Sequence, residues 1–293
     1  MGYSGRYHAA SLAAVFIALA IGILIGIGLA DDVVSTARQE LENTLRDERD
    51  TARDDVADLE GEIDRERQFS DDAYPALVAG RLARQQVAVV ELGDVPATDV
   101  DVTAEEAISA IGEAGGKLAS VSSISLPPDV GPLADAAGRR FAMAKRDPAA
   151  LEDLGAAIGT QIVGGGGLIE RVKPELFASF NGSLEGVSRV VLIRSPSEDL
   201  SLEDKAAADA FEAGLVTGIE RAAKGSAGVE RSSTDPPTLA VFTDLGVASV
   251  DHVDTLAGKV SLTYALAGAK GDFGTKEGAT SFLPEPLPEP PSR

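Results

Sequence analysis

A run of uncharged residues near the start of the chain, AASLAAVFIALAIGILIGIGLA at residues 9–30, limits the fold more than any other feature. A helix needs about 20 consecutive apolar residues to cross a bilayer core of about 30 Å, and Ser11 is the only polar interruption here. The run therefore predicts one transmembrane helix. A cleaved secretory signal is the alternative, because Gly28-Leu29-Ala30 before Asp31 would pass as a small-residue cleavage site. Signal cores have about 7–15 apolar residues, so the length of the run favours a permanent anchor.

The charges on either side of the run predict its orientation. Arg6 precedes it and Asp31 and Asp32 follow it, and basic residues favour the cytoplasmic side of a span. We therefore expect a single-pass membrane protein with residues 1–8 in the cytoplasm. Everything after residue 30 is then extracytoplasmic.

Small residues recur every four positions along the predicted span. They are Ala10, Ala14, Ala18, Gly22, Gly26 and Ala30. Such a stripe lets two helix backbones approach closely in lipid, so Ala14, Ala18, Gly22 and Gly26 are candidates for self-association of the span. The alternative is chance, because alanine and glycine are frequent throughout this sequence.

The charge balance and the absence of cysteine exclude several classes of function. Lysine and arginine number 26 against 47 acidic residues, which gives a formal net charge of −21. A surface of this sign repels nucleic acid, so no nucleic acid partner is expected. Cysteine is absent, so no disulfide stabilises the exported part and no thiolate is available for catalysis or for soft metals.

Residues 31–72 change to Asp, Glu and Arg with spaced apolar positions and contain no proline, which predicts a long polar helix. Leu45, Ala52 and Leu59 lie seven residues apart, and Val56 and Ile63 occupy the alternate positions. This is the a/d pattern of a coiled coil, so we expect a coiled-coil stalk and a homo-oligomer formed through span and stalk. A solitary helix is the alternative.

The helix is expected to end near Tyr74-Pro75, because the residue before proline is pushed out of the helical region. A pattern of β-branched runs alternating with capped helices begins at residue 86 and continues to residue 283. This alternation is typical of parallel βαβ units. The fold class is therefore α/β: a transmembrane helix, a stalk, and an extracytoplasmic domain with a mostly parallel, Rossmann-like sheet.

The individual elements of this domain are predicted as follows. The strands cover residues 86–92, 117–125, 189–193 and 238–242. The helices cover residues 103–113, 132–145, 148–162 and 255–267, and a further helix follows Ser201 and extends to about Ala222. Glycines 164–167 are interpreted as a flexible connector. The proline-rich residues 284–293 are expected to be an extended, disordered tail.

Three aspartates, Asp94, Asp199 and Asp244, follow strand-like runs, where open α/β sheets place their ligands. Each is also an ordinary loop or capping residue. The segment Asp251-His252-Val253-Asp254 groups two carboxylates with an imidazole, so Asp251, His252 and Asp254 are weak candidates for metal ligands. A solvent-exposed loop histidine is the simpler interpretation of His252.

Two separated segments of the chain form a recognisable pair. The first is residues 7–22, YHAASLAAVFIALAIG, followed by an acidic segment. The second is residues 249–255, SVDHVDT, followed by Gly258, Ala265-Leu266 and Gly274. Both segments resemble the copper transport protein B (MctB-like) family of actinobacteria, and the order of parts agrees over nearly the whole chain. The resemblance implies a role in copper transport or copper homeostasis in the cell envelope, with copper as the implied metal.

The chain departs from that family in the closing loop, where the aromatic residue is Phe273 and where Asp272 and Thr275 replace histidines. Soft copper sites use cysteine and methionine sulfur and also imidazole, but this chain has no cysteine, two methionines and two histidines. Copper binding by the chain itself is therefore implied by the resemblance alone.

Two functions from different classes follow. The first is copper transport, which would require an oligomer or a partner, since one uncharged span does not line a pore. The second is a non-transport envelope scaffold in which the stalk sets a distance and the α/β domain binds an envelope protein. An enzyme is a third class and is not expected, because cysteine is absent and only one histidine lies outside the membrane-proximal region, which leaves carboxylate chemistry as the open alternative.

Overall fold

The computed structural model describes residues 5–93, 102–197 and 199–285. The chain divides into two units, residues 1–68 and residues 69–293. Helix α1 (Gly5–Val78) contains all of the described part of the first unit and enters the second. Its stretch Tyr7–Gly28 is long and apolar enough to cross a membrane, and none of it is buried in the structure. One candidate for the predicted span is thus present in the described residues.

The predicted helix break at Tyr74-Pro75 is wrong, because α1 continues through Pro75 to Val78. Tertiary packing outweighs the local preference: Val78 is fully buried, and the Tyr74 hydroxyl donates a hydrogen bond to Glu113. Burial raises the pKa of Tyr74, and the adjacent Glu113 carboxylate raises it further. The last turns of α1 therefore belong to the core of the second unit.

The second unit is built on a sheet of seven strands among the described residues. They are β1 (Gln86–Gly93), β2 (Lys117–Ile124), β3 (Phe177–Gly182), β4 (Arg189–Ser195), β5 (Ser226–Val229), β6 (Ala248–Val250) and β7 (Asp272–Phe273). Their order across the sheet is β3-β2-β1-β4-β5-β6-β7. Every pairing is parallel except β2 with β3. The mostly parallel sheet predicted from the sequence is confirmed.

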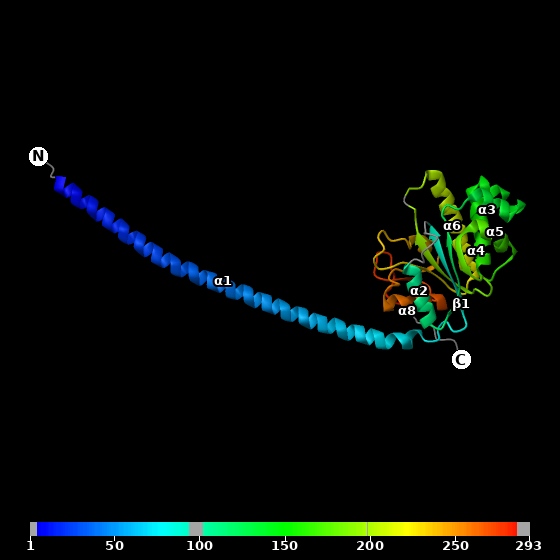
Figure 1. Cartoon of the computed structure of the whole chain (residues 1–293), viewed down its shortest axis with the longest axis horizontal. Coiled ribbons are helices and arrows are strands. Elements are labelled where there is room, and N and C mark those ends of the chain that lie inside the picture. Colours follow the sequence, from blue (N-terminus) through cyan, green and yellow to red (C-terminus); the bar gives the residue numbers. More distant parts are fainter. Residues whose placement is uncertain (1–4, 94–101, 198, 286–293) are drawn as a thin grey trace. The chain divides into compact units, whose positions relative to one another are not determined.

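Helices cover both faces of the sheet (Figure 1). One face carries α3 (Val130–Ala137), the 3-10 helix Arg139–Lys145, α4 (Pro148–Ile162), α5 (Gly167–Leu176), α6 (Leu202–Ala222) and α7 (Ala240–Asp244). The other face carries α2 (Val102–Glu113), α8 (Leu256–Ala267) and the last turns of α1. Because both faces are covered, the central strands are buried on both sides, as parallel strands usually are.

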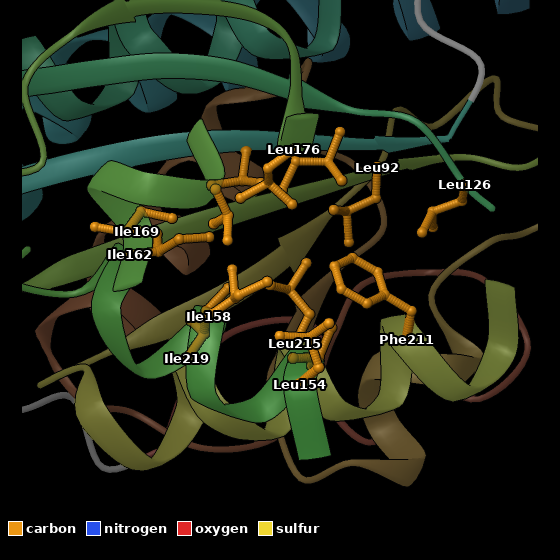
Figure 2. Packing of buried hydrophobic residues seen from close by; sticks show 14 of the residues in the cluster. Leu92, Leu126, Leu154, Ile158, Ile162, Ile169, Leu176, Phe211, Leu215 and Ile219 are labelled. Carbon is orange, nitrogen blue, oxygen red and sulfur yellow. The ribbon is translucent and has the colours of Figure 1, made fainter. Parts of the chain in front are cut away.

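Helices α4 and α6 pack with their backbones almost in contact. A Cβ atom added at Gly159 would lie 2.1 Å from the carbonyl oxygen of Leu215, and one added at Gly218 would lie 2.2 Å from that of Ala156. Gly155 and Gly214 make equally close approaches. The apolar side chains of the pair then reach the sheet, as Figure 2 shows for Leu154, Ile158, Ile162, Phe211, Leu215 and Ile219.

Several predicted elements need correction. Residues 238–242 are not a strand, since α7 begins at Ala240. The predicted helix over 132–145 is divided at Gly138 into α3 and a 3-10 helix. Strands β3, β5, β6 and β7 and helix α5 were not predicted. Most of the tail, residues 286–293, lies outside the described residues.

Candidate functional site

The topology of the sheet defines where a ligand would bind. Strand β1 leads through α2 to β2 on one side, while β4 leads through α6 to β5 on the other. Open α/β sheets bind ligands at the carboxyl ends of the strands, at the point where the strand order reverses. Here that point lies between β1 and β4. Asp94, which follows β1, lies outside the described residues.

A cavity of about 520 Å³ lies beside this point, at the carboxyl ends of β4 and β5. Arg194 at the end of β4 lines it, and its Nε donates to the Glu212 carboxylate of α6 at 2.7 Å. The Glu212 side chain is 1% exposed and that of Arg194 is 22% exposed. Thr103 from the first turn of α2, Ser195 and Ser197 also line the cavity.

Glu230, the residue after β5, separates this cavity from a second one of about 180 Å³ and lines both. It is buried, and its carboxylate accepts hydrogen bonds from the amide and the hydroxyl of Thr238 at 2.7 and 2.9 Å. The Lys276 ammonium completes the site with an ion pair at 2.7 Å. Lys276 Nζ also donates to the carbonyl oxygens of Arg231 and Thr234. Both charges are therefore paired inside the protein.

Asp251, the residue after β6, connects the last two strands to the closing loop. Its carboxylate accepts hydrogen bonds from the backbone N–H groups of Thr275 and Lys276, and it lies 2.9 Å from His252 Nδ1. A Cβ atom at Gly274 would lie 1.8 Å from the carboxylate, so glycine alone lets the loop approach this closely. The Asp251 carboxylate is consequently occupied by donors of its own chain.

His252 is not the exposed loop residue expected from the sequence, since it is 2% exposed. Its ring stacks on Phe282, with ring centres 5.2 Å apart. Its backbone carbonyl packs against Gly258, where a Cβ atom would lie 1.8 Å away. His252 Nε2 is buried without a hydrogen-bond partner. Packing by Phe282, which lies 30 residues along the chain, covers the ring.

The three candidate metal ligands do not converge on one point. Asp251 and His252 contact one another, whereas Asp254 accepts hydrogen bonds from the amide and hydroxyl of Ser232 at 2.8 and 2.6 Å. Within residues 5–93, 102–197 and 199–285, no group of three or more His, Cys, Asp and Glu side chains is arranged to hold a metal ion. Copper bound here would need ligands from outside this cluster.

The other predicted site residues are also dispersed. Asp199 lies exposed in the loop before α6, and Asp244 ends α7, where it lines the smaller cavity. Sequence reasoning missed Arg194, Glu230 and Lys276. For Arg194 a signal existed, because it follows the predicted strand at residues 189–193, the same criterion that selected Asp94. Glu230 follows β5, which was not predicted, so the sequence offered no such signal for it.

The hydrogen bonds between Ser232 and Asp254 contribute a stability of the fold that depends on pH. Burial raises the pKa of Asp254, but the hydrogen bonds from Ser232 outweigh it and hold that pKa below its usual value. A lowered pKa in the folded state stabilises the fold above the unfolded pKa of about 4, and this stabilisation is lost as pH falls through the lowered value. We expect Ser232→Ala to lower Tm by roughly 2–4 °C near neutral pH and by less in acid.

The measurement is thermal unfolding of both proteins over a pH series. The same substitution in an Asp254→Asn background is the control, because no carboxylate is left to titrate there. A Tm difference that is independent of pH in the natural background would contradict the assignment.

The fold and the site define an α/β protein with an open, mostly parallel sheet and one apolar N-terminal helix long enough to cross a membrane. The chain belongs to the MctB family, described as "Copper transport outer membrane protein, MctB", which matches residues 3–284. No match was found among curated proteins. The resemblance stated from residues 7–22 and 249–255 is thus confirmed at the level of the family.

The structure also explains why the two parts of the closing motif occur together. Ser249 Oγ donates to the Asp272 carboxylate at 2.7 Å, and Asp251 accepts from the Thr275 amide. Gly258 and Gly274 make room for His252 and Asp251, respectively. In this chain the motif therefore fixes the last strands of the sheet to one another.

Proposed function

We propose that the protein acts in copper transport as a membrane-anchored member of an assembly, and that it neither lines a pore alone nor holds copper in a site of its own. The membership of the MctB family supports the copper role. The observation that carries the rest of the proposal is that the described residues contain one helix apolar and long enough to cross a membrane, Tyr7–Gly28, since one helix cannot enclose a conducting path. The α/β domain then serves to bind a partner outside the cytoplasm.

The residues at the carboxyl edge of the sheet support binding rather than catalysis. The carboxylates of Glu212, Glu230 and Asp251 are all engaged by donors of the same chain. A general base or a metal ligand needs a carboxylate that can release such partners. The larger cavity is instead lined by polar residues such as Arg194 and Ser195 together with apolar ones such as Ile193 and Pro236. Such a mixed surface suits recognition of a polypeptide segment.

A copper titration of the purified full chain tests the absence of a resident copper site. We expect no saturable binding of Cu(I) or Cu(II) at micromolar affinity, because imidazole and sulfur ligands are scarce and His252 is buried. Saturable binding that is lost in His252→Ala would overturn this part of the proposal. Met143→Leu is the control, since Met143 is the exposed methionine of the second unit.

Deletion of the gene tests the copper role itself. We expect the deletion strain to lose copper tolerance and to accumulate copper, and the full chain to restore both. A chain without residues 1–30 should fail to restore them, because it lacks the anchor. Unchanged copper content with an altered cell envelope would favour the second function, a non-transport scaffold, which the two ion pairs at the sheet edge also suit.

A further inference from the structure

Helix α1 carries large apolar side chains that have no packing partner in a single chain, and they lie beyond the membrane-spanning stretch. Leu45, Val56, Leu59 and Ile63 are 55%, 53%, 57% and 48% exposed. The segment around them is helical without interruption and is otherwise dominated by Asp, Glu and Arg. Exposure of an apolar stripe on such a polar helix to water is unfavourable, and another surface that covers the stripe lowers the free energy.

We propose that a second copy of this chain covers the stripe, and that the two helices run parallel and in register as a two-stranded coiled coil. A heptad frame with Leu45, Ala52 and Leu59 at d places Val56 and Ile63 at a. β-Branched residues at a and leucine at d favour two strands over three or four. Arg49, also at a, interrupts the apolar seam, and a polar residue at an a position helps to fix register.

The charges that flank the seam identify the orientation. The g positions 48, 55 and 62 are Glu, Asp and Glu, and the e positions 46, 53, 60 and 67 are Arg, Arg, Glu and Arg. In a parallel pair each g residue faces the e residue five positions later in the other helix. Glu48 then meets Arg53 and Glu62 meets Arg67, each twice per dimer. Only Asp55 meets a like charge, at Glu60.

An antiparallel pair would bring like charges together instead. It would place g positions against g positions, all of which are acidic, and e positions against e positions, most of which are arginine. Anchoring both helices in one bilayer removes the antiparallel arrangement in any case. It also raises the local concentration of the stalks, so a seam of less than three heptads can associate.

The arginines are available for these contacts. In the single chain Arg53 lies 3.8 Å from Asp50 and Arg67 lies 3.5 Å from Asp64, with side chains 69% and 74% exposed. Exposed pairs of this kind contribute little to stability, so a second helix can share the guanidinium at little cost. Glu48 has no oppositely charged residue three or four positions away on its own helix.

Cross-linking of the full chain in detergent tests orientation and register together, because the protein has no cysteine of its own. Ala52→Cys places a thiol at d, and the matched variant Ala57→Cys places one at b on the outer face. We expect at least tenfold more disulfide dimer from Ala52→Cys under mild oxidation. Equal yields from both variants, or none from either, would overturn the proposal.

A charge exchange provides the second test. Glu48→Arg should raise the dimer dissociation constant about tenfold, since two attractive pairs become repulsive. The double variant E48R/R53E should restore it, and this rescue cannot act within one helix because residues five apart do not face each other. Failure of the rescue, or a monomer at all concentrations by sedimentation, would overturn the dimer. The proposed copper role would survive that result, since it is tested by copper content.

Discussion

Replacing Gly159 by alanine will destabilise the second unit by about 3 kcal/mol or more, which corresponds to a change of about a hundredfold in the ratio of folded to unfolded protein. The added methyl group would lie 2.1 Å from the carbonyl oxygen of Leu215 and 3.0 Å from the amide of Ile219. Both atoms belong to the backbone of α6, so no side chain can rotate away. Helix α4 must move from α6, and the core shown in Figure 2 must open with it.

Gly112→Ala is the matched control for this prediction. Gly112 also lies inside a helix, α2, but a Cβ atom there meets nothing within 4 Å. Alanine is the better helix former by about 1 kcal/mol, so this variant should be as stable as the natural protein or more so. Thermal unfolding of the full chain, monitored by the appearance of protease cleavage within residues 86–283, measures the stability of both variants. Equal stability of the two variants would contradict the close approach of α4 and α6.

The central strands could be predicted because their sequences are unambiguous. Residues 86–92 and 189–193 are short β-branched runs bounded by turn residues, and both became buried parallel strands. Their neighbours were harder. Strand β5, SAGV, has small side chains because the ring of Phe242 packs over Gly228, 2.1 Å from where a Cβ atom would lie. A strand of small residues that lies under an aromatic ring lacks the run of large apolar side chains by which strands are predicted.

The same contact explains the false strand at residues 238–242. The run TLAVF is apolar because Phe242 is fully buried against β5, while α7 begins at Ala240. Apolar runs of this length do not distinguish a strand from the first turn of a buried helix. The apolar run indicates only that these residues are buried. Whether they form a strand or a helix is decided by their packing against β5.

The helices were predicted where capping residues marked them. Ser201 accepts a hydrogen bond from the Asp204 amide and Thr255 accepts one from the Gly258 amide, as capping residues do, so α6 and α8 begin where expected. At Pro75 the local rule failed, because the buried Val78 and the hydrogen bond of Tyr74 keep the helix intact. The effect of proline on the preceding residue is outweighed there by contacts with residues that are distant in the sequence.

The candidate site likewise combines features that could be predicted from the sequence with features that could not. The segment Asp251–Asp254 was recognised as a cluster of polar residues, but the strand β6 that it follows was not predicted. Its partners could not be predicted, because Thr275 and Lys276 reach Asp251 across the sheet edge, and Ser232 reaches Asp254 from the loop after β5. Those partners decide whether the carboxylates are free ligands or internal acceptors.

The second large effect is expected at Lys276. Lys276→Met removes the ammonium group and keeps the length of the side chain, so Glu230, 3% exposed, is left with a buried charge and only the two donors of Thr238. Removing one member of a buried ion pair costs about 3–5 kcal/mol, because the remaining charge has lost both water and partner. We expect a loss near the lower end of this range, measured by thermal and urea unfolding.

Lys270→Met is the matched control, since Lys270 also pairs with a glutamate, Glu220, but is 55% exposed. Exposed pairs contribute about 0–1 kcal/mol, so this variant should unfold near the natural protein. Adding Glu230→Gln to Lys276→Met should recover part of the lost stability, because the neutral amide can still accept from Thr238 without a buried charge. If Lys276→Met were no more destabilising than Lys270→Met, the charges at the sheet edge would be solvated. The carboxylates would then be free to act as a general base or as metal ligands, and the proposal that the edge acts only in binding would lose this support.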